Sequence, residues 1–459
     1  MYFSARVQHA LPSARVQLAL PRALRASTRG KLVRALGTSS VSFPELDAPH
    51  ALNNVPLSIR ALVRGPKLLR VAGHPLATLK DEIFAHFHAV ECASARTSPE
   101  AAARGGGFAA FESALTPVVS VAANFDDLLT PADHVSRRPS DTFYVDDTRV
   151  LRCHMTAHQV ELLRAGHSRF LMAGDVYRRD TVDATHAPVF HQLDGVRVWS
   201  AAELPAAARD ALAAGDAAPA RAVALADLRA TLEALAARLF PGAQTRWVDA
   251  HFPFTDPSLE LEVFWDGKWL EVLGAGVVRA PILAATRRTD AAVGWAFGLG
   301  LERLAMVRHA IPDIRLFWSQ DARFLAQFSK PLALGAAPAQ FESFSKHPAC
   351  YKDIAFWVPA GTRIESEADA DGAGRVAAVD ARSPTFHEND VHAAVREVAG
   401  DLVESVERID KFEHPKTRRT SLCFRILYRA PDRSLTNGEV DAVQDRVKAA
   451  VVALGFELR

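Results

Sequence analysis

The sequence predicts an α+β fold, and three stretches of the chain carry this prediction. Gly174–Gly195 holds two segments of alternating polarity around a polar loop, which is typical of a β-hairpin. Gly294–Met306 begins with the same alternation and then changes to helical spacing, as expected where a strand leads into a helix. From about Ser345 to Arg459 the patterns follow the order β-α-β-β-α-β. We therefore expect sheet and helix both in the longer N-terminal part and in the C-terminal part.

Length and composition fit a globular protein of two or three domains, with 459 residues, 49% of them hydrophobic and 23% charged. Apolar runs such as Val118–Ala123 are far shorter than the roughly 20 residues that a membrane helix needs, so no membrane association is expected. A net charge of +1 gives no global basic field, and any contact to nucleic acid must come from local patches. The four cysteines lie far apart, which favours a reducing compartment without structural zinc.

The N-terminus departs from this balance. From Met1 to Phe43 there is no acidic residue, while arginines are interspersed with leucine, alanine and serine. This composition predicts an organellar transit peptide over residues 1–43. The mitochondrial matrix is the first choice, with the plastid or dual import as the alternative. A basic arm that binds nucleic acid is the other interpretation of the same residues.

Apolar spacing predicts further helices from His74 through Phe87 and in the latter half of Ala201–Ala237. Phe324–Phe344 contains two prolines and a glycine and is expected to be a linker. The C-terminal order predicts a ferredoxin-like domain, a fold that by itself says little about function. Its elements are expected at Tyr351–Val358, Asp390–Val398, Leu402–Phe412, Ser421–Tyr428, Gly438–Leu454 and Phe456–Leu458.

The predicted hairpin carries an unusual set of polar side chains. Arg178 and Asp180 occupy alternate positions on one side of the loop, and Phe190, Gln192 and Asp194 do so on the other. Alternate residues of a strand share a face, so one surface would present a cation, carboxylates, an amide and an aromatic ring. These groups suit a phosphate, an ammonium and a purine, all of which occur in an aminoacyl adenylate. A surface hairpin with a salt bridge is the plainer alternative.

A second stretch supports the ligand site. In GWAFGLGLERLAM, from Gly294, small residues occupy one face of the predicted strand and leave room for a ligand. The helix that follows carries Arg303 near its start.

With these residues in view, the chain resembles the class II aminoacyl-tRNA synthetases. The hairpin is similar to motif 2 of that family and GLGLER to motif 3, and the side chains resemble the phenylalanine-specific enzymes in their single-chain organellar form. The similarity covers nearly all of the chain after about His74. Further supporting segments are LRCHMTAHQ from Leu151, HFPFTDPSLELEV from His251 and EVLGAGVV from Glu271.

The resemblance implies a domain organisation and an activity. Residues 44–323 would form the catalytic domain, an antiparallel sheet flanked by helices, residues 324–344 the linker and residues 345–459 an anticodon-binding domain. The expected activity is the ATP-dependent attachment of L-phenylalanine to tRNA(Phe) through a phenylalanyl adenylate, for organellar translation. The family's single-chain form implies a monomer.

The resemblance also implies roles for the ATP-site residues. Arg178 would bind the α-phosphate and the charge that develops during attack, and Arg303 would hold the γ-phosphate. Phe190 would stack on the adenine. Catalysis would then consist of positioning and charge neutralisation by these two arginines, with Mg²⁺ bound together with ATP through ligands not assigned to particular residues.

Other positions match the family's amino-acid pocket. The family's contacts to the substrate's ammonium and carboxylate fall here on His154, Thr156, Asp180 and Gln192. Asp194 stands where the family usually has Glu. Phe252 and Phe254 would pack edge-on against the substrate ring, and Ala296 would lie at its far end. The complete set expected to bind phenylalanine is His154, Thr156, Asp180, Gln192, Asp194, Phe252, Phe254, Gly274 and Ala296.

The C-terminal part carries basic residues suited to RNA. Lys416, Arg418 and Arg419 are the expected tRNA contacts, although solvated strand ends would account equally well for such charges.

Three other interpretations remain. One is a synthetase-like RNA-binding or regulatory protein without charging activity, and another is a class II enzyme for a different amino acid. Intact ATP motifs argue against the first, and the FPF segment with the small Ala296 argues against the second. His154 and His158 have the spacing of a metal pair, but no Glu follows His154 as in metalloprotease helices.

Overall fold

A computed structural model of the chain describes residues 42–97, 107–112, 115–288, 291–319, 322–328, 338–342, 347–359, 362–365, 385–430 and 433–459. The predicted transit peptide therefore lies, except for its last two residues, outside the described residues. Residues 44–459 form one compact unit. Within the described part of the chain, no helix is both long enough and apolar enough to cross a membrane.

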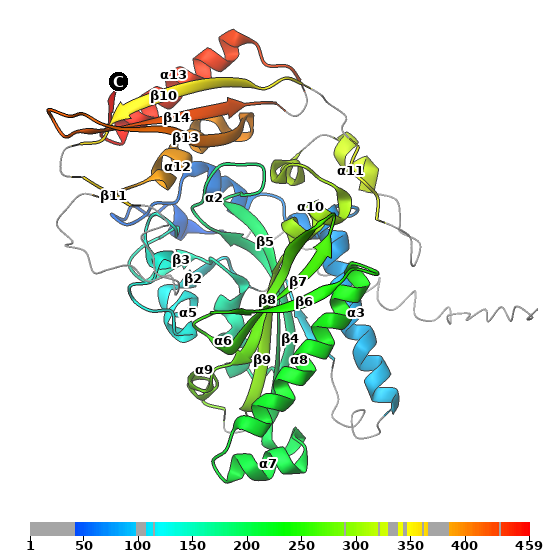
Figure 1. Ribbon diagram of the computed structural model, residues 1–459. Helices are drawn as coiled ribbons and strands as arrows, with labels where there is room; N and C mark the ends of the chain where they lie inside the picture. The colour runs from blue at the N-terminus through cyan, green and yellow to red at the C-terminus, as the bar shows by residue number, and fades with distance from the viewer. Residues whose placement is uncertain are drawn as a thin grey trace, which may run out of the picture. The chain divides into compact units, whose positions relative to one another are not determined.

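A seven-stranded sheet organises the N-terminal part, with the strand order β1-β4-β5-β9-β8-β7-β6 (Figure 1). β1 runs parallel to β4, and the other neighbours are antiparallel. The strands are β1 (Ala109–Phe111), β4 (Arg169–Tyr177), β5 (Val189–Ser200), β6 (Thr245–Ala250), β7 (Thr255–Trp265), β8 (Lys268–Val278) and β9 (Ala291–Gly300).

The predicted hairpin is confirmed as β4 and β5, whose register pairs Gly174 with Gln192 and Val176 with Phe190. The pairing continues one step past the strand end, because the N–H of Arg178 donates to the carbonyl of Pro188 at 3.0 Å. The sequence predicted that the strand continues through Asp180. This prediction is wrong after Arg178, since β4 ends at Tyr177.

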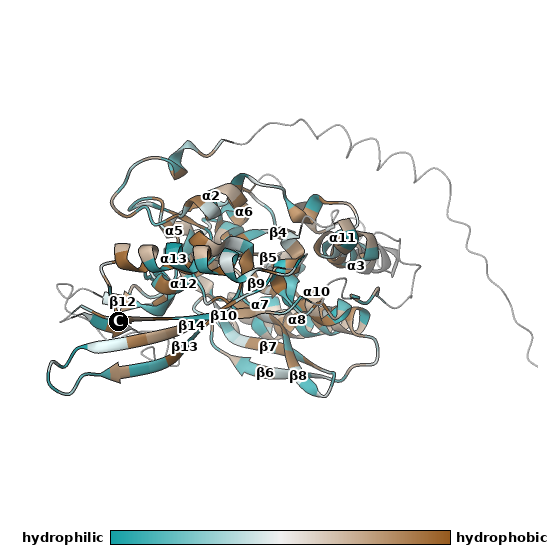
Figure 2. Cartoon of the chain, turned by 90° about the horizontal axis from the view of Figure 1, so that it is seen from above, coloured by the Kyte–Doolittle hydropathy of each residue, from teal (hydrophilic) through white to brown (hydrophobic). Residues whose placement is uncertain are grey.

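Helices cover one face of this sheet and build its core. The predicted helices are confirmed as α3 (Pro75–Thr97) and α8 (Ala218–Leu239), and the predicted strand-to-helix change as β9 followed by α10 (Leu301–His309). Leucines of α8, among them Leu228 and Leu232, pack with Trp295 and Phe297 of β9 in one apolar cluster. Apolar and polar segments alternate along these elements, as expected when each has one buried face (Figure 2).

The opposite face of the central strands is covered less evenly. Val196, Val278 and Ala296 of the sheet pack there with Met155 and Phe254 in a second cluster. Short elements line this side: α5 (Val121–Asn124), α6 (Gln159–Arg164), α9 (Ala280–Ala285) and the paired strands β2 (Val118–Ser120) and β3 (Arg149–Leu151). The loop before α6 thereby reaches the middle of the sheet, where the candidate site lies.

The C-terminal part has the predicted βαββαβ order. Its four-stranded sheet runs β13-β14-β10-β15, and Val391 and Val447 of its two helices share an apolar cluster with Phe356 and Phe424 of the sheet. A short parallel pair of strands comes in addition. The elements are β10 (Cys350–Trp357), β11 (Arg363–Glu365), β12 (Thr385–His387), α12 (Glu388–Ala399), β13 (Val403–Glu413), β14 (Thr420–Tyr428), α13 (Asn437–Ala453) and β15 (Glu457–Leu458).

The expected linker Phe324–Phe344 begins inside a helix instead. Helix α11 (Ala322–Phe328) buries Phe324 and Phe328 in the core of the N-terminal part. Two aromatic residues four positions apart fall on one face of a helix, which explains why this segment packs. The other α-helices within the described ranges are α2 (Leu57–Arg64) and α7 (Ala206–Ala213).

Candidate active site

Three neighbouring strands place the candidate pocket residues in one row. The register pairs Asp194 of β5 with Gly298 of β9, and Gly298 with Gly274 of β8. A Cβ atom on Gly298 would lie 2.9 Å from Oδ1 of Asp194, and one on Gly274 would lie 2.8 Å from the Phe252 ring. The glycines therefore keep the row open for groups that approach the sheet.

Asp194 is buried and only partly satisfied. Its Oδ2 accepts a hydrogen bond from the Thr156 hydroxyl at 2.7 Å. Its Oδ1 is buried and has no hydrogen-bond partner among the described residues. Burial disfavours the charged form and raises the pKa of Asp194 to about 7. The unpartnered Oδ1 can accept a hydrogen bond from a ligand. A positively charged donor would also favour the ionised form of Asp194.

His154 and Gln192 are two further polar residues of the expected amino-acid site, and they lie near each other in the fold. The Nδ1 atom of His154 is buried without a partner among the described residues. Burial, reinforced by the positive charge of Arg178, lowers the pKa of His154 to about 3, so the ring is neutral at pH 7. The Oε1 atom of Gln192 accepts from the main-chain N–H of Met155 at 3.3 Å, which ties β5 to the loop that carries His154 and Thr156.

Arg178 and Phe190 lie together at the end of the hairpin. The Nε of Arg178 donates to the carbonyl of Cys153 at 2.9 Å. Its guanidinium lies 5.1 Å from the centre of the Phe190 ring, a cation–π distance. No described residue makes a further hydrogen bond or ion pair with the Arg178 guanidinium, and both residues are half-buried.

Arg303 is exposed and paired with an acidic neighbour. Its side chain is 60% exposed and its Nη1 lies 3.1 Å from Glu271. Burial raises the pKa of Glu260 in β7, and the negative charges of Glu271 and Glu262 add to this effect. No group of three or more His, Cys, Asp or Glu side chains among the described residues is placed to hold a metal ion by itself.

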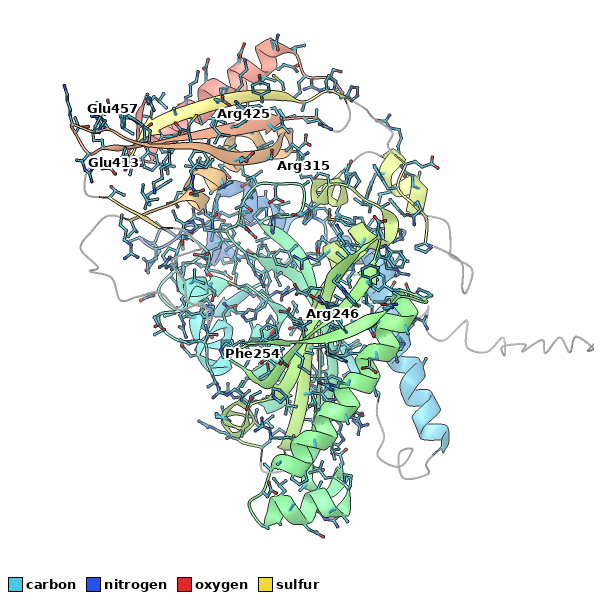
Figure 3. All side chains as sticks on the ribbon, viewed as in Figure 1. Arg246, Phe254, Arg315, Glu413, Arg425 and Glu457 are labelled. Atoms are coloured by element: carbon cyan, nitrogen blue, oxygen red, sulfur yellow. The ribbon has the colours of Figure 1, made fainter. Side chains whose placement is uncertain are left out.

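The apolar residues of the expected amino-acid site also lie close together. The rings of Phe252 and Phe254 stack with 5.8 Å between their centres and 10° between their planes. Ala296 is 6% exposed and belongs to the same apolar cluster as Val196 and Phe254. Figure 3 shows Phe254 against the strands of the large sheet.

Asp180 is the expected pocket residue that the structure places elsewhere. It lines a small cavity together with Pro56, Asn389 and Arg396. Its main-chain carbonyl accepts from Arg396 at 3.1 Å, so this stretch contacts the C-terminal part of the chain. The chain leaves the strand direction after Tyr177, and Asp180 therefore does not follow Arg178 on the pocket face.

Sequence reasoning missed a buried network around Asp175. Asp175 of β4 accepts from Arg152 at 2.6 Å, from Lys67 at 2.7 Å and from the Tyr177 hydroxyl at 2.8 Å. Arg152 also lies 3.0 Å from Nε2 of His158, whose pKa is lowered to about 3 by burial and then by that guanidinium. The only signal in the sequence is that the acidic Asp175 interrupts an apolar run in the strand.

The expected tRNA contacts lie at one end of the C-terminal sheet. Arg418 pairs with Glu413 and Arg419 with Glu457, at 2.7 and 2.6 Å. Figure 3 shows both glutamates at this end of the sheet. The guanidinium of Arg419 also lies over the Trp357 ring at 5.2 Å. These pairs offset part of the local positive charge.

Comparisons with known families match both parts of the chain. The family described as tRNA synthetases class II core domain (F) matches residues 73–206 and 218–328. The family described as ferredoxin-fold anticodon binding domain matches residues 345–459. The expected α+β fold, a class II core followed by a ferredoxin-fold domain, is confirmed.

Several curated relatives are similar over most of their length. The chain is 45% identical to the chloroplastic/mitochondrial phenylalanine–tRNA ligase of Arabidopsis thaliana, over 89% of this chain and 83% of the relative. It is 40% identical to the mitochondrial phenylalanine–tRNA ligase of Mus musculus, over 100% of this chain and 97% of the relative. The mitochondrial phenylalanine–tRNA ligase of Saccharomyces cerevisiae is 36% identical, over 73% and 80% respectively.

Proposed function

Because the chain belongs to the phenylalanine–tRNA ligase family of class II aminoacyl-tRNA synthetases, we propose that it joins L-phenylalanine to tRNA(Phe) with ATP. The reaction has two steps. The carboxylate of phenylalanine attacks the α-phosphate of ATP, which forms phenylalanyl adenylate and releases diphosphate. A hydroxyl of the terminal ribose of tRNA then attacks the acyl carbon, which forms the ester and releases AMP.

The buried, half-satisfied Asp194 carries this proposal. Its Oδ1 has no partner among the described residues, and the strand register aligns Asp194 with Gly298 and Gly274, against which the Phe252 ring lies. Phe254 stacks on Phe252 and shares an apolar cluster with Ala296. An amino acid with an ammonium group and an aromatic side chain offers a donor to Oδ1 and apolar surface to these apolar side chains. His154, Thr156, Gln192 and Gly274 border the same space as its polar edge and floor. Phenylalanine-dependent exchange of pyrophosphate into ATP tests the proposal.

Arg178 and Arg303 act as the catalytic residues. Arg178 donates to the α-phosphate and neutralises the charge that grows on it during attack, for which a planar guanidinium is suited. Phe190 stacks on the adenine. Arg303 exchanges Glu271 for the γ-phosphate when ATP enters, and this exchange costs little because the exposed pair is weak.

The acidic residues beside Arg303 suit a divalent cation that arrives with ATP. Burial raises the pKa of Glu260, the negative charges of Glu271 and Glu262 raise it further, and a cation would relieve this repulsion. We assign Glu260 and Glu271 as its protein ligands, since Mg²⁺ commonly takes one or two carboxylates and completes its shell with phosphates and water. Mg²⁺ bound there supplies neutralisation of the phosphate charges.

Ala296→Gly should relax the specificity of the pocket. Removal of one methyl group from the apolar wall opens space for para-chlorophenylalanine, and a change of this size alters discrimination by only ~1–3 kcal/mol. We expect measurable pyrophosphate exchange with the analogue while exchange with phenylalanine persists. If the variant gains no exchange with the analogue, Ala296 does not lie at the far end of the substrate ring.

Reversal of Lys416, Arg418 and Arg419 to glutamate should weaken tRNA binding and flatten its dependence on salt. Each lost phosphate contact lowers the slope of log affinity against log salt by roughly one. Because Glu413 and Glu457 already pair with two of these residues, we expect a change smaller than three contacts would give. Pyrophosphate exchange should be unaffected. An unchanged salt slope would identify the residues as a solvated loop.

The chain acts in an organelle, and we propose the mitochondrial matrix, with the plastid or dual import as the alternative. Two features support this: the acid-free, arginine-rich residues 1–43 and the organellar names of its relatives. We further propose that it is active as a monomer, since one polypeptide carries both domains. Sedimentation at nanomolar concentration tests this, and a stable dimer that loses activity on dilution would contradict it.

A further inference from the structure

A buried pair outside the pocket joins the hairpin to the helix that carries Arg303. Oε2 of Glu302 accepts the main-chain N–H of His191 at 2.8 Å, and Oε1 accepts from Nδ1 of the His191 ring at 2.6 Å. The two side chains are 4% and 3% exposed. The His191 ring stacks on Trp318 with 5.9 Å between centres. Because side chains alternate along β5, His191 points away from the face that presents Phe190 and Gln192.

The place of this pair explains why a carboxylate is needed. The ladder between β5 and β9 ends at the pair Gln192–Gly300, since α10 begins at Leu301. In a longer ladder, a carbonyl of β9 would accept the main-chain N–H of His191. The helix that begins at Leu301 offers no such carbonyl at this place. A buried N–H without an acceptor is costly, and the Glu302 side chain supplies the acceptor. Its position in the first turn also suits the helix dipole.

We propose that Glu302 is a positioning residue for ATP. Its two bonds fix the main chain between Phe190 and Gln192 to the main chain next to Arg303. This inference rests on the proposed function, in which Phe190 supports the adenine and Arg303 the γ-phosphate. The pair then sets the distance between the supports for the two ends of one ligand molecule, although neither Glu302 nor His191 touches that ligand.

Because the Arg303 side chain is exposed, a fixed position of its main chain is important. Its side chain changes partner from Glu271 to phosphate, so its main chain is the part that stays in place when ATP arrives. In reactions that depend on positioning, moving a binding group by as little as about 1 Å can lower the rate strongly. The buried Glu302–His191 pair holds the main chain next to Arg303 in this position.

Two substitutions of Glu302 separate the effect of its side-chain length from the effect of its charge. Glu302→Gln keeps the length of the side chain, and its amide can accept from the His191 N–H and donate to an unprotonated Nδ1. Glu302→Asp keeps the charge but is one methylene too short. We expect the KM for ATP in pyrophosphate exchange to stay near the native value in Glu302→Gln and to rise on the order of 10-fold or more in Glu302→Asp. The KM for phenylalanine should change less in both.

A matched control lies on the same helix. Arg308 of α10 pairs with Glu82 of α3 at 2.7 Å and is also buried, but this pair does not reach the hairpin. Glu82→Gln should lower the midpoint of thermal unfolding and leave the KM for ATP unchanged. The inference is overturned if Glu302→Asp retains the native KM for ATP below its unfolding temperature. It is also overturned if Glu302→Gln raises that KM as much as Glu302→Asp, or if Glu82→Gln raises it equally.

Direct titration of ATP by calorimetry keeps this test separate from the proposed activity. If the native chain shows no phenylalanine-dependent exchange, the proposed function fails, while the affinity for ATP of the native chain and of each variant is still measured. Weaker ATP binding in Glu302→Asp than in Glu302→Gln supports the positioning role. Equal affinities in the two variants contradict it.

Discussion

Arg178→Ala should reduce phenylalanine-dependent pyrophosphate exchange by about 10²- to 10³-fold, the usual cost of losing a donor to the charge that develops in a transition state. The reduction should appear mainly in kcat, because the interaction strengthens as charge grows on the α-phosphate. The fold should survive, since Arg178 is half-buried and contributes one hydrogen bond, to the carbonyl of Cys153, and a contact to Phe190.

The neighbouring arginine provides the control for this substitution. The guanidinium of Arg179 donates to the carbonyl of Pro139 at 2.6 Å and to Asp390 at 3.0 Å, away from Phe190. Arg179→Ala should therefore leave the exchange rate nearly unchanged. Near-native exchange by a folded Arg178→Ala variant, or an equal loss in Arg179→Ala, would remove Arg178 from the catalytic site.

Asp194→Asn should raise the KM for phenylalanine by roughly 10²-fold or more, because loss of one member of a buried charge pair typically costs 2–5 kcal/mol. The KM for ATP should change much less, since Asp194 lies among the residues assigned to the amino acid. Thr156 can still donate to the amide oxygen at this position, so the local structure should persist. A native KM for phenylalanine in this variant would exclude Asp194 from the ammonium site.

The same carboxyl group predicts a pH dependence with a definite sign. The pKa of Asp194 is raised from 3.8 to about 7 in the free protein, and the ammonium group requires the ionised form. The affinity for phenylalanine should therefore fall as the pH drops below about 7, and the KM for phenylalanine should not show this dependence in Asp194→Asn.

Protein stability should follow the opposite course. A carboxyl group with a raised pKa in the folded state stabilises the fold most at low pH, and this contribution is lost as the pH rises through about 7. Asp194→Asn should accordingly unfold at a higher temperature than the native chain at pH 8 while binding phenylalanine poorly. An unchanged unfolding temperature would indicate that the buried carboxyl group is not strained.

The elements that could be predicted from sequence are those in which local periodicity and burial agree. The hairpin of β4 and β5, the change from β9 to α10 and the two C-terminal helices each bury one face, so apolar spacing alone locates them. The common face of Gln192 and Asp194 on β5 followed from the same alternation, because residues two positions apart share a face in any strand.

Asp180 could not be placed correctly because its surroundings come from distant parts of the chain. Arg396 contacts its carbonyl, and more than two hundred residues separate the two in sequence. Alternation extrapolated past Tyr177 therefore assigned a direction that only the fold determines. Asp175 and Glu302 were missed for a related reason, since each acts through buried partners that no spacing rule connects. The predicted linker is wrong only at its start, where Phe324 and Phe328 already carried the helical spacing that buries them.

Pyrophosphate exchange measured with each of the twenty amino acids tests the central claim most directly. Besides labelled pyrophosphate, the assay requires only ATP, Mg²⁺ and the amino acid. It therefore reports on the residues assigned to the amino acid, among them Asp194, Phe252 and Phe254, without depending on tRNA. The account predicts exchange with phenylalanine and at most weak exchange with tyrosine, because Ala296 closes the far end of the pocket. Exchange with another amino acid and none with phenylalanine would contradict it.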